Sequence, residues 1–509
     1  RLRSARGGVT TDGDGIFHIS AQPSDELLIS NVGYQSQEIR IGNRDNLTIT
    51  MSPLIATLSE VTVALGQRRS KNSLPYSTQQ LAGSEITKTP STNFLDNLSG
   101  KVAGLQITTS NTMGGSNNAI LRGVKSLTQS NQALFVVDGV PYDNTNQARS
   151  SYDLGNSVSD INPEDIESMS VLKGAAASAL YGSRGSNGVI LITTKKGSKR
   201  KGIGVTVNAG ITAGTPDHST LPVYQQQNGP GIGSQGDADA GNPNPFFYWQ
   251  KTSFSPTQPV QIVQTDADQA TGPAYDKNLM VYNWDAFSPG NPNFGKATPW
   301  VPAKHNQPTD YFVTPITNIV SIAADGGDDK ATFRVGYTRT NDKGFLPNSN
   351  QRKTLLTLSA SYNLNDKLTV GGQINYSDDA AIGRYGYGYG GGNGTQINPM
   401  TDFRQWWQTN IDLNAQKADF FRTLTNATWN WQTTSYLQNA PGSVLKPKFH
   451  DNPYWVRYKN FESDDRSRYT GNVYANYKVA PFLSVLGRVS MDSWNQLQET
   501  RYDVGSYGT

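Results

Sequence analysis

The stretch LKGAAASALYGSRGSNGVILITTKKG, residues 172–197, decides the fold of the first half of the chain. Its early part, Gly174–Leu180, consists of small residues compatible with a helix, which Tyr181-Gly182 ends. Val189–Thr194 is a continuous run of apolar and β-branched residues that predicts a buried strand. A helix of small residues followed by a buried strand indicates a globular domain whose elements lie very close together.

Four blocks precede this stretch in order: LSGKVAGLQI (98–107), ILRGVKSL (120–127), ALFVVDGVPYDN (133–144) and INPEDIESMSVLKG (161–174). In the last block, Asn162-Pro163-Glu164 predicts the start of a helix with Pro in its first turn, and apolar residues follow near helical spacing up to Leu172. Together the blocks resemble the plug domain of TonB-dependent outer-membrane transporters. The three consecutive alanines and the β-rich segment before the plug resemble the SusC/RagA-like branch, which imports oligosaccharides or peptides.

From Gly202 onward the sequence alternates with a period of two. In the first segment, 203–211, Ile and Val alternate with Gly, Thr and Asn, as in a barrel strand with one lipid-facing and one interior face. Similar segments occur at 316–324, 331–338, 354–364, 368–376, 468–479 and 482–492. The connections 325–329 and 365–366 are short, whereas 212–310 and 378–467 are long. Short turns on one rim and long loops on the other are typical of outer-membrane barrels.

The first 55 residues are predicted to be all β. Candidate strands with Asp-Gly and Gly-Asn turns between them are Gly15–Ser20, Glu26–Asn31, Gln37–Ile41 and Leu47–Met51. This pattern resembles a carboxypeptidase-regulatory-like β-sandwich whose first strand is absent.

The predicted organisation is therefore a truncated β-sandwich (1–55), a linker (56–73), an α+β plug (74–198) and the first strands of a transmembrane antiparallel β-barrel (199–509). A barrel that encloses such a plug has about 22 strands. We therefore expect the chain to be the N-terminal part of a longer protein.

The linker contains a short β-prone segment, Leu58–Gly66. An extended peptide between two domains can add to a partner sheet as an edge strand through its main-chain hydrogen bonds. By resemblance, this is where the family carries the TonB box, formed here by Glu60, Val61, Thr62, Val63 and Ala64. The alternative is a plain interdomain linker.

The resemblance implies a mechanism and a set of partners. Ligand binding outside exposes the box, TonB adds to it as a strand, and the inner-membrane TonB–ExbB–ExbD complex pulls on the plug. A SusD-like surface lipoprotein is the implied lid, the substrate is an oligosaccharide or peptide, and the barrel faces outer-membrane lipid. No nucleic acid is expected, since the net charge is only +3 over 509 residues.

Two plug arginines, Arg122 and Arg184, have family counterparts that face the barrel wall and pair with carboxylates. Because Arg gives bidentate pairing that Lys does not reproduce, the resemblance predicts plug–barrel contacts at both positions; an exposed loop Arg is the alternative. Asp138 is expected to serve a turn.

Aromatic residues in the predicted external loops are the candidates for ligand contact, since flat rings stack on sugars or peptide side chains. They are Trp300, Tyr311, Trp406, Trp407, Trp455 and the Tyr385–Tyr389 run. The alternative is that these rings form the interfacial girdle of the barrel.

Enzyme chemistry is not expected. The chain has no Cys and only four dispersed His, which excludes disulfides, thiolate metal sites and Cys nucleophiles and leaves no believable triad or metal pair. Two formal dinucleotide motifs, at 231–236 and 386–391, neither follow a strand nor open a helix. We therefore predict neither a cofactor nor a metal.

Three further readings stay open at this stage. One is import of a chelated metal or vitamin, and another is a non-transporting outer-membrane scaffold. The third is a soluble β-rich module. No run of 18 apolar residues occurs, which excludes a membrane-spanning helix.

Overall fold

The structure is a computed structural model of residues 1–509, and it divides into two compact units, Arg1–Gln80 and Leu81–Thr509. The residues described are 2, 8–12, 15–31, 36–51, 61–64, 67–70, 78–89, 91–110, 112–142, 144, 152–232, 241–384, 386, 398–432 and 446–507. Among them, no helix is long and apolar enough to cross a membrane.

The first unit contains two small antiparallel pairs. Strand β1 (Glu26–Ile29) pairs with β2 (Gln37–Arg40), and β3 (Val61–Ala64) pairs with β4 (Gln67–Ser70). Two of the four strands predicted for residues 1–55 are present, but 15–20 and 47–51 form no strand. The β-sandwich stays a prediction.

The plug opens the second unit and is built around a five-stranded sheet in the order β5-β10-β11-β8-β9. Its strands are β5 (Thr78–Ala82), β8 (Leu134–Val137), β9 (Val140–Tyr142), β10 (Ile166–Leu172) and β11 (Val189–Thr194). Around the sheet lie α1 (Gly83–Ile86), η2 (Phe94–Leu98), the hairpin β6 (Leu105–Thr108) and β7 (Asn118–Leu121), α2 (Ala175–Tyr181) and η5 (Gly182–Gly185). One apolar core, including Phe94, Phe135 and Ile190, holds them together.

The stretch that opened the sequence analysis folds as predicted. Helix α2 ends at Gly182, whose φ of 61° lies in the region that favours glycine, and β11 has the bounds expected for the buried strand. Strand β11 pairs with β10 on one side and, in parallel, with β8 on the other.

The helix predicted from Asn162 onward is wrong. Residues Pro163–Asp165 form a single 3-10 turn (η4), and Ile166–Leu172 is strand β10. The helical spacing of its apolar residues is coincidental, because the last four residues of β10 are all buried and a strand covered on both faces carries apolar residues without alternation. Asn162 caps the turn by accepting a hydrogen bond from the backbone N–H of Glu164 at 3.2 Å.

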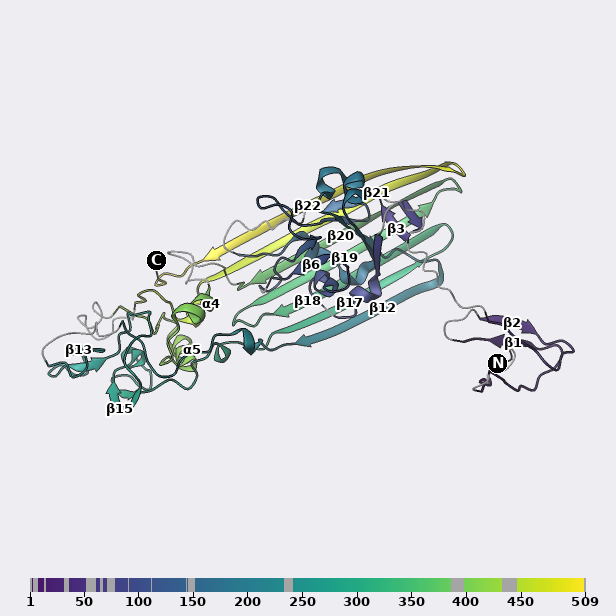
Figure 1. Ribbon diagram of the computed structural model, residues 1–509. Helices are drawn as coiled ribbons and strands as arrows, with labels where there is room; N and C mark the ends of the chain where they lie inside the picture. Colours follow the sequence, from purple (N-terminus) through teal and green to yellow (C-terminus); the bar gives the residue numbers. More distant parts are fainter. Residues whose placement is uncertain are drawn as a thin grey trace. The chain divides into compact units, whose positions relative to one another are not determined.

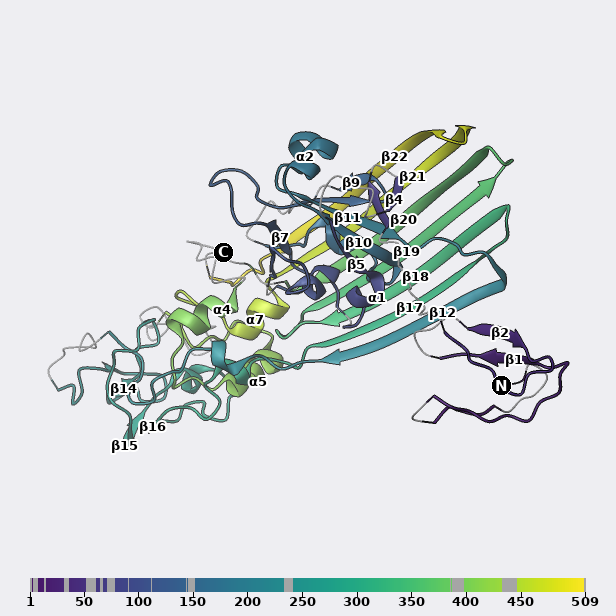
Figure 2. The same cartoon turned by 45° about the vertical axis from the view of Figure 1, so that its right-hand side comes forward.

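The second half of this unit is one antiparallel seven-stranded sheet, which we call the wall (Figures 1 and 2). Its strands, in spatial and chain order, are β12 (Arg200–Ala213), β17 (Ile316–Gly327), β18 (Ala331–Lys343), β19 (Asn350–Asn363), β20 (Leu368–Ile382), β21 (Phe461–Ala480) and β22 (Leu483–Arg501). Each of the seven alternating segments predicted from the sequence coincides with one of these strands. In both views the plug lies against one face of the wall.

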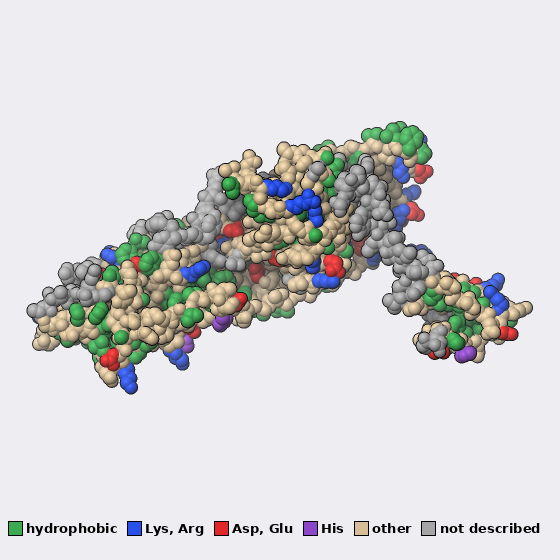
Figure 3. Space-filling model, in the orientation of Figure 1, with side chains coloured by type: hydrophobic (Ala, Val, Ile, Leu, Met, Phe, Trp, Pro, Cys, Tyr) green, Lys and Arg blue, Asp and Glu red, His purple; other side chains and the backbone are tan. Residues whose placement is uncertain are grey.

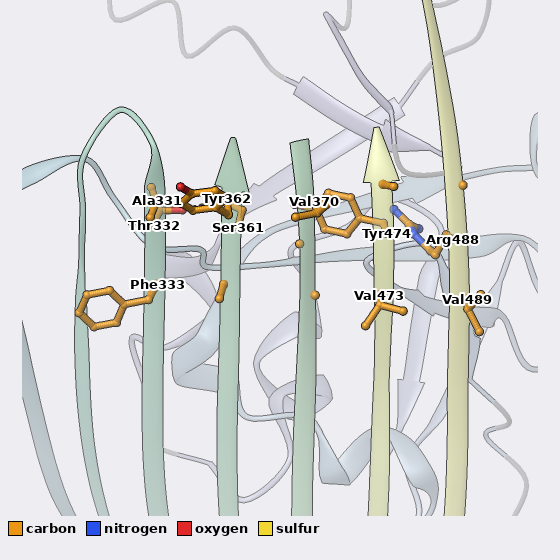
Figure 4. Close-up of a pocket in the computed structure, with 15 residues that line it drawn as sticks. Ala331, Thr332, Phe333, Ser361, Tyr362, Val370, Val473, Tyr474, Arg488 and Val489 are labelled. Carbon is orange, nitrogen blue, oxygen red and sulfur yellow. Dashed lines mark hydrogen bonds between the residues drawn. The ribbon is translucent and has the colours of Figure 1, made fainter. Parts of the chain in front are cut away.

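The face of the wall turned away from the plug is apolar and exposed. Its side chains include Ile203, Val207, Val320, Val335, Leu358, Ile374, Val473 and Val489. Figure 4 shows Phe333, Val473 and Val489 among the residues that line a pocket in this face, and Ala360 and Gly372 also line it. Tyr469 and Tyr477 are exposed and stand eight residues apart on β21, about 27 Å along the strand at 3.4 Å per residue. At the tilt of about 35–45° usual for barrel strands this corresponds to about 20 Å of height, within a membrane-spanning apolar band.

The long connections at one end of the wall fold into a body of their own, the loop body, formed by the described parts of 214–315, 383–460 and 502–507. Its strands are β13 (Tyr248–Gln250), β14 (Val260–Ile262), β15 (Asp276–Val281) and β16 (Thr298–Trp300). Its helices are η6 (His218–Thr220), η7 (Trp284–Phe287), η8 (Pro308–Asp310), α4 (Pro399–Thr401), the π-helix η9 (Asp402–Trp406), α5 (Leu413–Thr423) and α7 (Pro453–Tyr458). At the opposite rim the strands join through short turns at 328–330, 364–367 and 481–482.

Candidate functional site: the interface between plug and wall

The plug meets the wall through a short acidic segment, residues 157–165. It contains the 3-10 turns η3 (Ser157–Asp160) and η4, whose carboxylates Asp160 and Asp165 are buried. The two successive turns direct backbone and side-chain oxygens toward the wall. The inner face of the wall, which receives them, is polar and buried. It carries Ser321, Arg334, Thr338, Gln351, Lys353, Asp379, Arg466, Arg468 and Thr470.

Asp165 is seated on β18 and β19. Its Oδ1 accepts a hydrogen bond from Nη2 of Arg334 at 2.7 Å, and its Oδ2 accepts one from Oγ1 of Thr357 at 2.8 Å. The position of Gly336 leaves room for this carboxylate, since a Cβ there would lie 3.1 Å from Oδ1 of Asp165 and 2.5 Å from Oγ1 of Thr357. Asn162 adds a hydrogen bond from Nδ2 to Oγ1 of Thr338 at 3.0 Å.

Asp160 is held by two arginines of β21. Nη2 of Arg466 lies 2.8 Å from its Oδ1, and Nη1 of Arg468 lies 3.5 Å from its Oδ2. Arg468 is itself held by both carboxylate oxygens of Asp492, at 2.9 and 2.7 Å. Its guanidinium also lies over the ring of Tyr142, 4.6 Å from the centroid. The wall thus presents positive charge where the plug presents negative charge.

Further contacts extend the interface on both sides. Nζ of Lys353 donates to the carbonyl of Ser159 at 3.0 Å and lies 3.4 Å from Asp379 of the wall. The hydroxyl of Tyr142 donates to Oγ1 of Thr470 at 2.6 Å. Burial raises the pKa of Tyr142 to about 12, against the lowering effect of the Thr470 hydrogen bond, so this hydroxyl keeps its proton for donation.

Asp138 serves the turn expected of it and also touches the wall. Its φ of 49° places it in the tight turn between β8 and β9, and its carboxylate accepts hydrogen bonds from the backbone N–H and hydroxyl of Thr194. In addition, Nε2 of Gln373 donates to its Oδ2 at 2.8 Å, and Nη1 of Arg488 donates to its backbone carbonyl at 2.7 Å.

The two arginines predicted to make plug–barrel contacts lie elsewhere. Arg122 and Arg184 are exposed, and Arg122 is in the left-handed region with a φ of 61°. Within the described residues, neither forms an ion pair with the wall. Figure 3 shows Lys and Arg side chains on the side of the plug that faces away from the wall. Pairing of Arg122 and Arg184 with barrel carboxylates stays a prediction.

The aromatic residues proposed for ligand contact mostly form the core of the loop body. Trp300, Tyr311, Trp407 and Trp455 are between 0% and 6% exposed. They stack on other rings, as in the edge contact of Phe247 with Trp300 at 5.2 Å. This differs from both the ligand role and the girdle role considered from the sequence, because the long loops fold together and need these rings to fill their interior. Trp406 is half-buried, and 385 and 387–389 lie outside the described residues.

A buried polar centre lies within the same core. Nδ1 of His450 is 2.9 Å from Oδ1 of Asp402, and the His450 ring stacks on Trp429 with an interplanar angle of 12°. Burial raises the pKa of Asp402, although the His450 ring opposes this, and burial raises the pKa of the neighbouring Asp451 to about 6. These groups connect loop segments that are distant in sequence, since Asp451 also accepts hydrogen bonds from Asn426 and Tyr507.

The predicted TonB box falls partly outside the described residues, since Glu60 is among those left out. Val61–Ala64 form strand β3, which pairs with β4. Val61 lies opposite Ser70 at one end of the pair, and Ala64 lies opposite Gln67 at the other end. A two-stranded ribbon has backbone groups of each strand available on its outer side. The extended backbone is compatible with strand addition, and the assignment stays a prediction.

Sequence reasoning missed the acidic segment and its partners. One signal was available: Asp464, Arg466 and Arg468 alternate along β21 and therefore share one face. Charges on the interior face of a strand indicate either a water-filled lumen or partners inside it.

Comparison with known proteins now identifies the fold. Residues 70–189 match the family described as TonB-dependent Receptor Plug Domain. The TonB-dependent receptor SusC of Bacteroides thetaiotaomicron is 39% identical over 206 residues, which are 40% of this chain and 20% of SusC. Across this region the chain is homologous to SusC-like TonB-dependent receptors. A TonB-dependent receptor of Formosa agariphila is 28% identical over 391 residues, 76% of this chain and 33% of that protein.

The fold was also compared with a solved structure of the RagAB peptide importer in its open-open state. The alignment includes 88% of this chain and 44% of the matched chain, with 18% sequence identity and a TM-score of 0.56. At that identity the likeness concerns the fold alone. The matched regions thus span a fifth to under half of these relatives. The predicted outer-membrane localisation of this SusC/RagA-like homologue is confirmed, and an exposed apolar sheet face argues against the soluble module.

Proposed function

We propose that this protein imports oligosaccharides or peptides across the outer membrane in a TonB-dependent manner. The observation that supports this most is the interface just described, in which a folded plug rests on the polar inner face of a wall whose outer face suits lipid. By analogy with the family, the plug blocks the lumen at rest and must leave the wall for passage. No catalytic role is proposed for any residue.

The energetics of the interface require an energy source for opening. Removing one partner of a buried ion pair costs about 3–5 kcal/mol, because a charge is left buried without compensation. Asp160 and Asp165 each lie in such a pair. As the segment leaves, water replaces each lost partner, so the cost is recovered only after opening. A pull from TonB on the linker supplies the work in this proposal.

The remaining parts of the proposal follow the family. Residues 1–55 would form the carboxypeptidase-regulatory-like sandwich, 56–73 the TonB-box linker, 74–198 the plug and 199–509 part of a barrel of about 22 strands. The partners would be the TonB–ExbB–ExbD complex and a SusD-like lipoprotein over the loops.

The box provides the experiment. Val63→Pro removes a backbone N–H that strand addition uses, while Val63→Ala keeps it. Uptake of an oligosaccharide or peptide by cells should fall to the level of a TonB-deletion strain with Val63→Pro and stay near normal with Val63→Ala. Uptake that persists without TonB would contradict the proposal.

A further inference from the structure

The seat of Asp165 on the wall is built like a binding site for a carboxylate. We call Arg334, Gly336 and Thr357 the carboxylate seat. Arg334, which is 7% exposed, supplies a guanidinium, Thr357 supplies a hydroxyl donor, and Gly336 supplies the space. All three belong to the wall, whereas the carboxylate they hold belongs to the plug.

The guanidinium of the seat is only partly used. Among the described residues, Nε of Arg334 is buried and has no hydrogen-bond partner, and the same holds for Nε of Arg466. A planar guanidinium can hold a carboxylate with two parallel hydrogen bonds, but Asp165 takes only one from Arg334. A cavity of about 20 Å³ adjoins Asp160, Asp165 and Thr357, which is room for about one water.

Departure of the plug removes the carboxylate that pairs with Arg334. The wall carboxylate directly across the β17–β18 pair, Asp325, is engaged by Ser198 and Arg200. Three cations of the inner face have carboxylate partners within the wall: Arg468 has Asp492, Lys353 has Asp379, and Arg466 lies 3.8 Å from Asp379. Arg334 has its ion pair with the plug residue Asp165 alone, as far as the described residues go. Opening would therefore expose an arginine with a vacant carboxylate position.

We propose that the carboxylate seat binds carboxylate groups of the imported substrate once the plug has left, so that Asp165 occupies in the closed state the position a substrate carboxylate takes in the open state. This rests on the proposed import function. The substrate class it favours is acidic: oligosaccharides or peptides that carry carboxylates. Water solvates Arg334 once the plug has left, and a substrate carboxylate that replaces this water gains charge-assisted hydrogen bonds from the guanidinium, together with one from the Thr357 hydroxyl.

The seat can be tested without transport by chemical rescue. Asp165→Ala in the full chain removes the plug carboxylate and should raise the leak of reconstituted vesicles. Acetate should bind the vacated seat and lower that leak, with an effect that rises with concentration and saturates, as expected for a ligand of the closed form. Acetamide, equal in size but uncharged, should have no effect, and Asp165→Ala combined with Arg334→Gln should not respond to acetate.

Uptake by cells tests the substrate class. Arg334→Gln and Asp165→Asn both remove the ion pair, but only Arg334→Gln removes the seat. Arg334→Gln should therefore lower uptake of a galacturonate oligomer relative to a neutral glucose oligomer of equal length, and Asp165→Asn should leave that ratio unchanged. Absence of acetate rescue in a folded Asp165→Ala protein would overturn the seat. An equal loss for both oligomers would overturn the acidic class, while TonB-dependent uptake in the same cells would leave the import function standing.

Discussion

The two faces of the seven-stranded wall show opposite relations between polarity and burial. On β18, Arg334 is 7% exposed and its neighbour Val335 is 45% exposed. In a water-soluble sheet the apolar face is the buried one. Here the buried face is held by specific polar contacts with the plug, whereas the exposed face needs only to be apolar. The inner face should therefore be sensitive to the identity of each side chain and the outer face only to its polarity.

The largest effect is expected from charge reversal on the inner face. Arg334→Glu places a carboxylate against Asp165 and leaves both without a partner, a loss of at least about 3–5 kcal/mol at the interface. The plug should separate from the wall, and vesicles containing the protein should become leaky to small solutes. A second substitution, Asp165→Lys, should restore much of the seal, and failure of the pair to recover would count against direct contact.

One residue further along the strand, the outer face should respond differently. Val335→Lys exposes a charge to lipid and should cost about 2–4 kcal/mol near the middle of the bilayer. The expected result is a lower yield of folded protein in membranes, measured by resistance of the barrel to unfolding in detergent. The molecules that do fold should be no leakier to small solutes than the unmodified protein. A leak equal to that of Arg334→Glu would contradict the proposed difference between the two faces.

A smaller effect is expected from Gly336→Ala. The added Cβ would lie 2.5 Å from Oγ1 of Thr357 and close to the Asp165 carboxylate, and such overpacking costs about 1–3 kcal/mol. The leak should rise moderately while barrel stability stays near normal. The matched control is Gly487→Ala, since a Cβ there meets nothing within 4 Å; equal leak from both variants would contradict the role of Gly336.

The smallest effect is expected from Val335→Leu. This substitution keeps the outer face apolar and touches no part of the plug, so stability should change by less than about 0.5 kcal/mol. Thermal unfolding in detergent would measure it. A large loss would show that the outer face also has specific partners.

The sequence predicted the wall well because alternation is a local property. All seven strands could be placed from the period of two, and the short plug helix and β11 from their small and β-branched residues. The misplaced helix at 162–172 shows the limit: Ile166, Met169 and Leu172 lie near helical spacing, and a strand that is buried on both faces shows no period of two. Only the pairing with β11 decides for a strand. Local sequence does not report which distant strand will lie alongside.

The site was harder to predict for the same reason. Asp165 and Arg334 are 169 residues apart, and nothing near either residue reveals the other. The aromatic residues of the long loops were difficult for another reason. The sequence places Trp300 and Tyr311 in loops, where an exposed position is expected, but the loops fold together and bury both rings. A long loop rich in Trp and Tyr can be a small domain with its own core.

The central claim is that the plug must leave the inner face of the wall for import. The chain has no Cys, so a pair introduced at Asn162 and Thr338, whose side chains lie 3.0 Å apart, can be bridged selectively by oxidation or by a short thiol cross-linker. We predict that uptake stops when the bridge forms and returns when it is reduced. Normal uptake with the bridge fully formed would contradict the account.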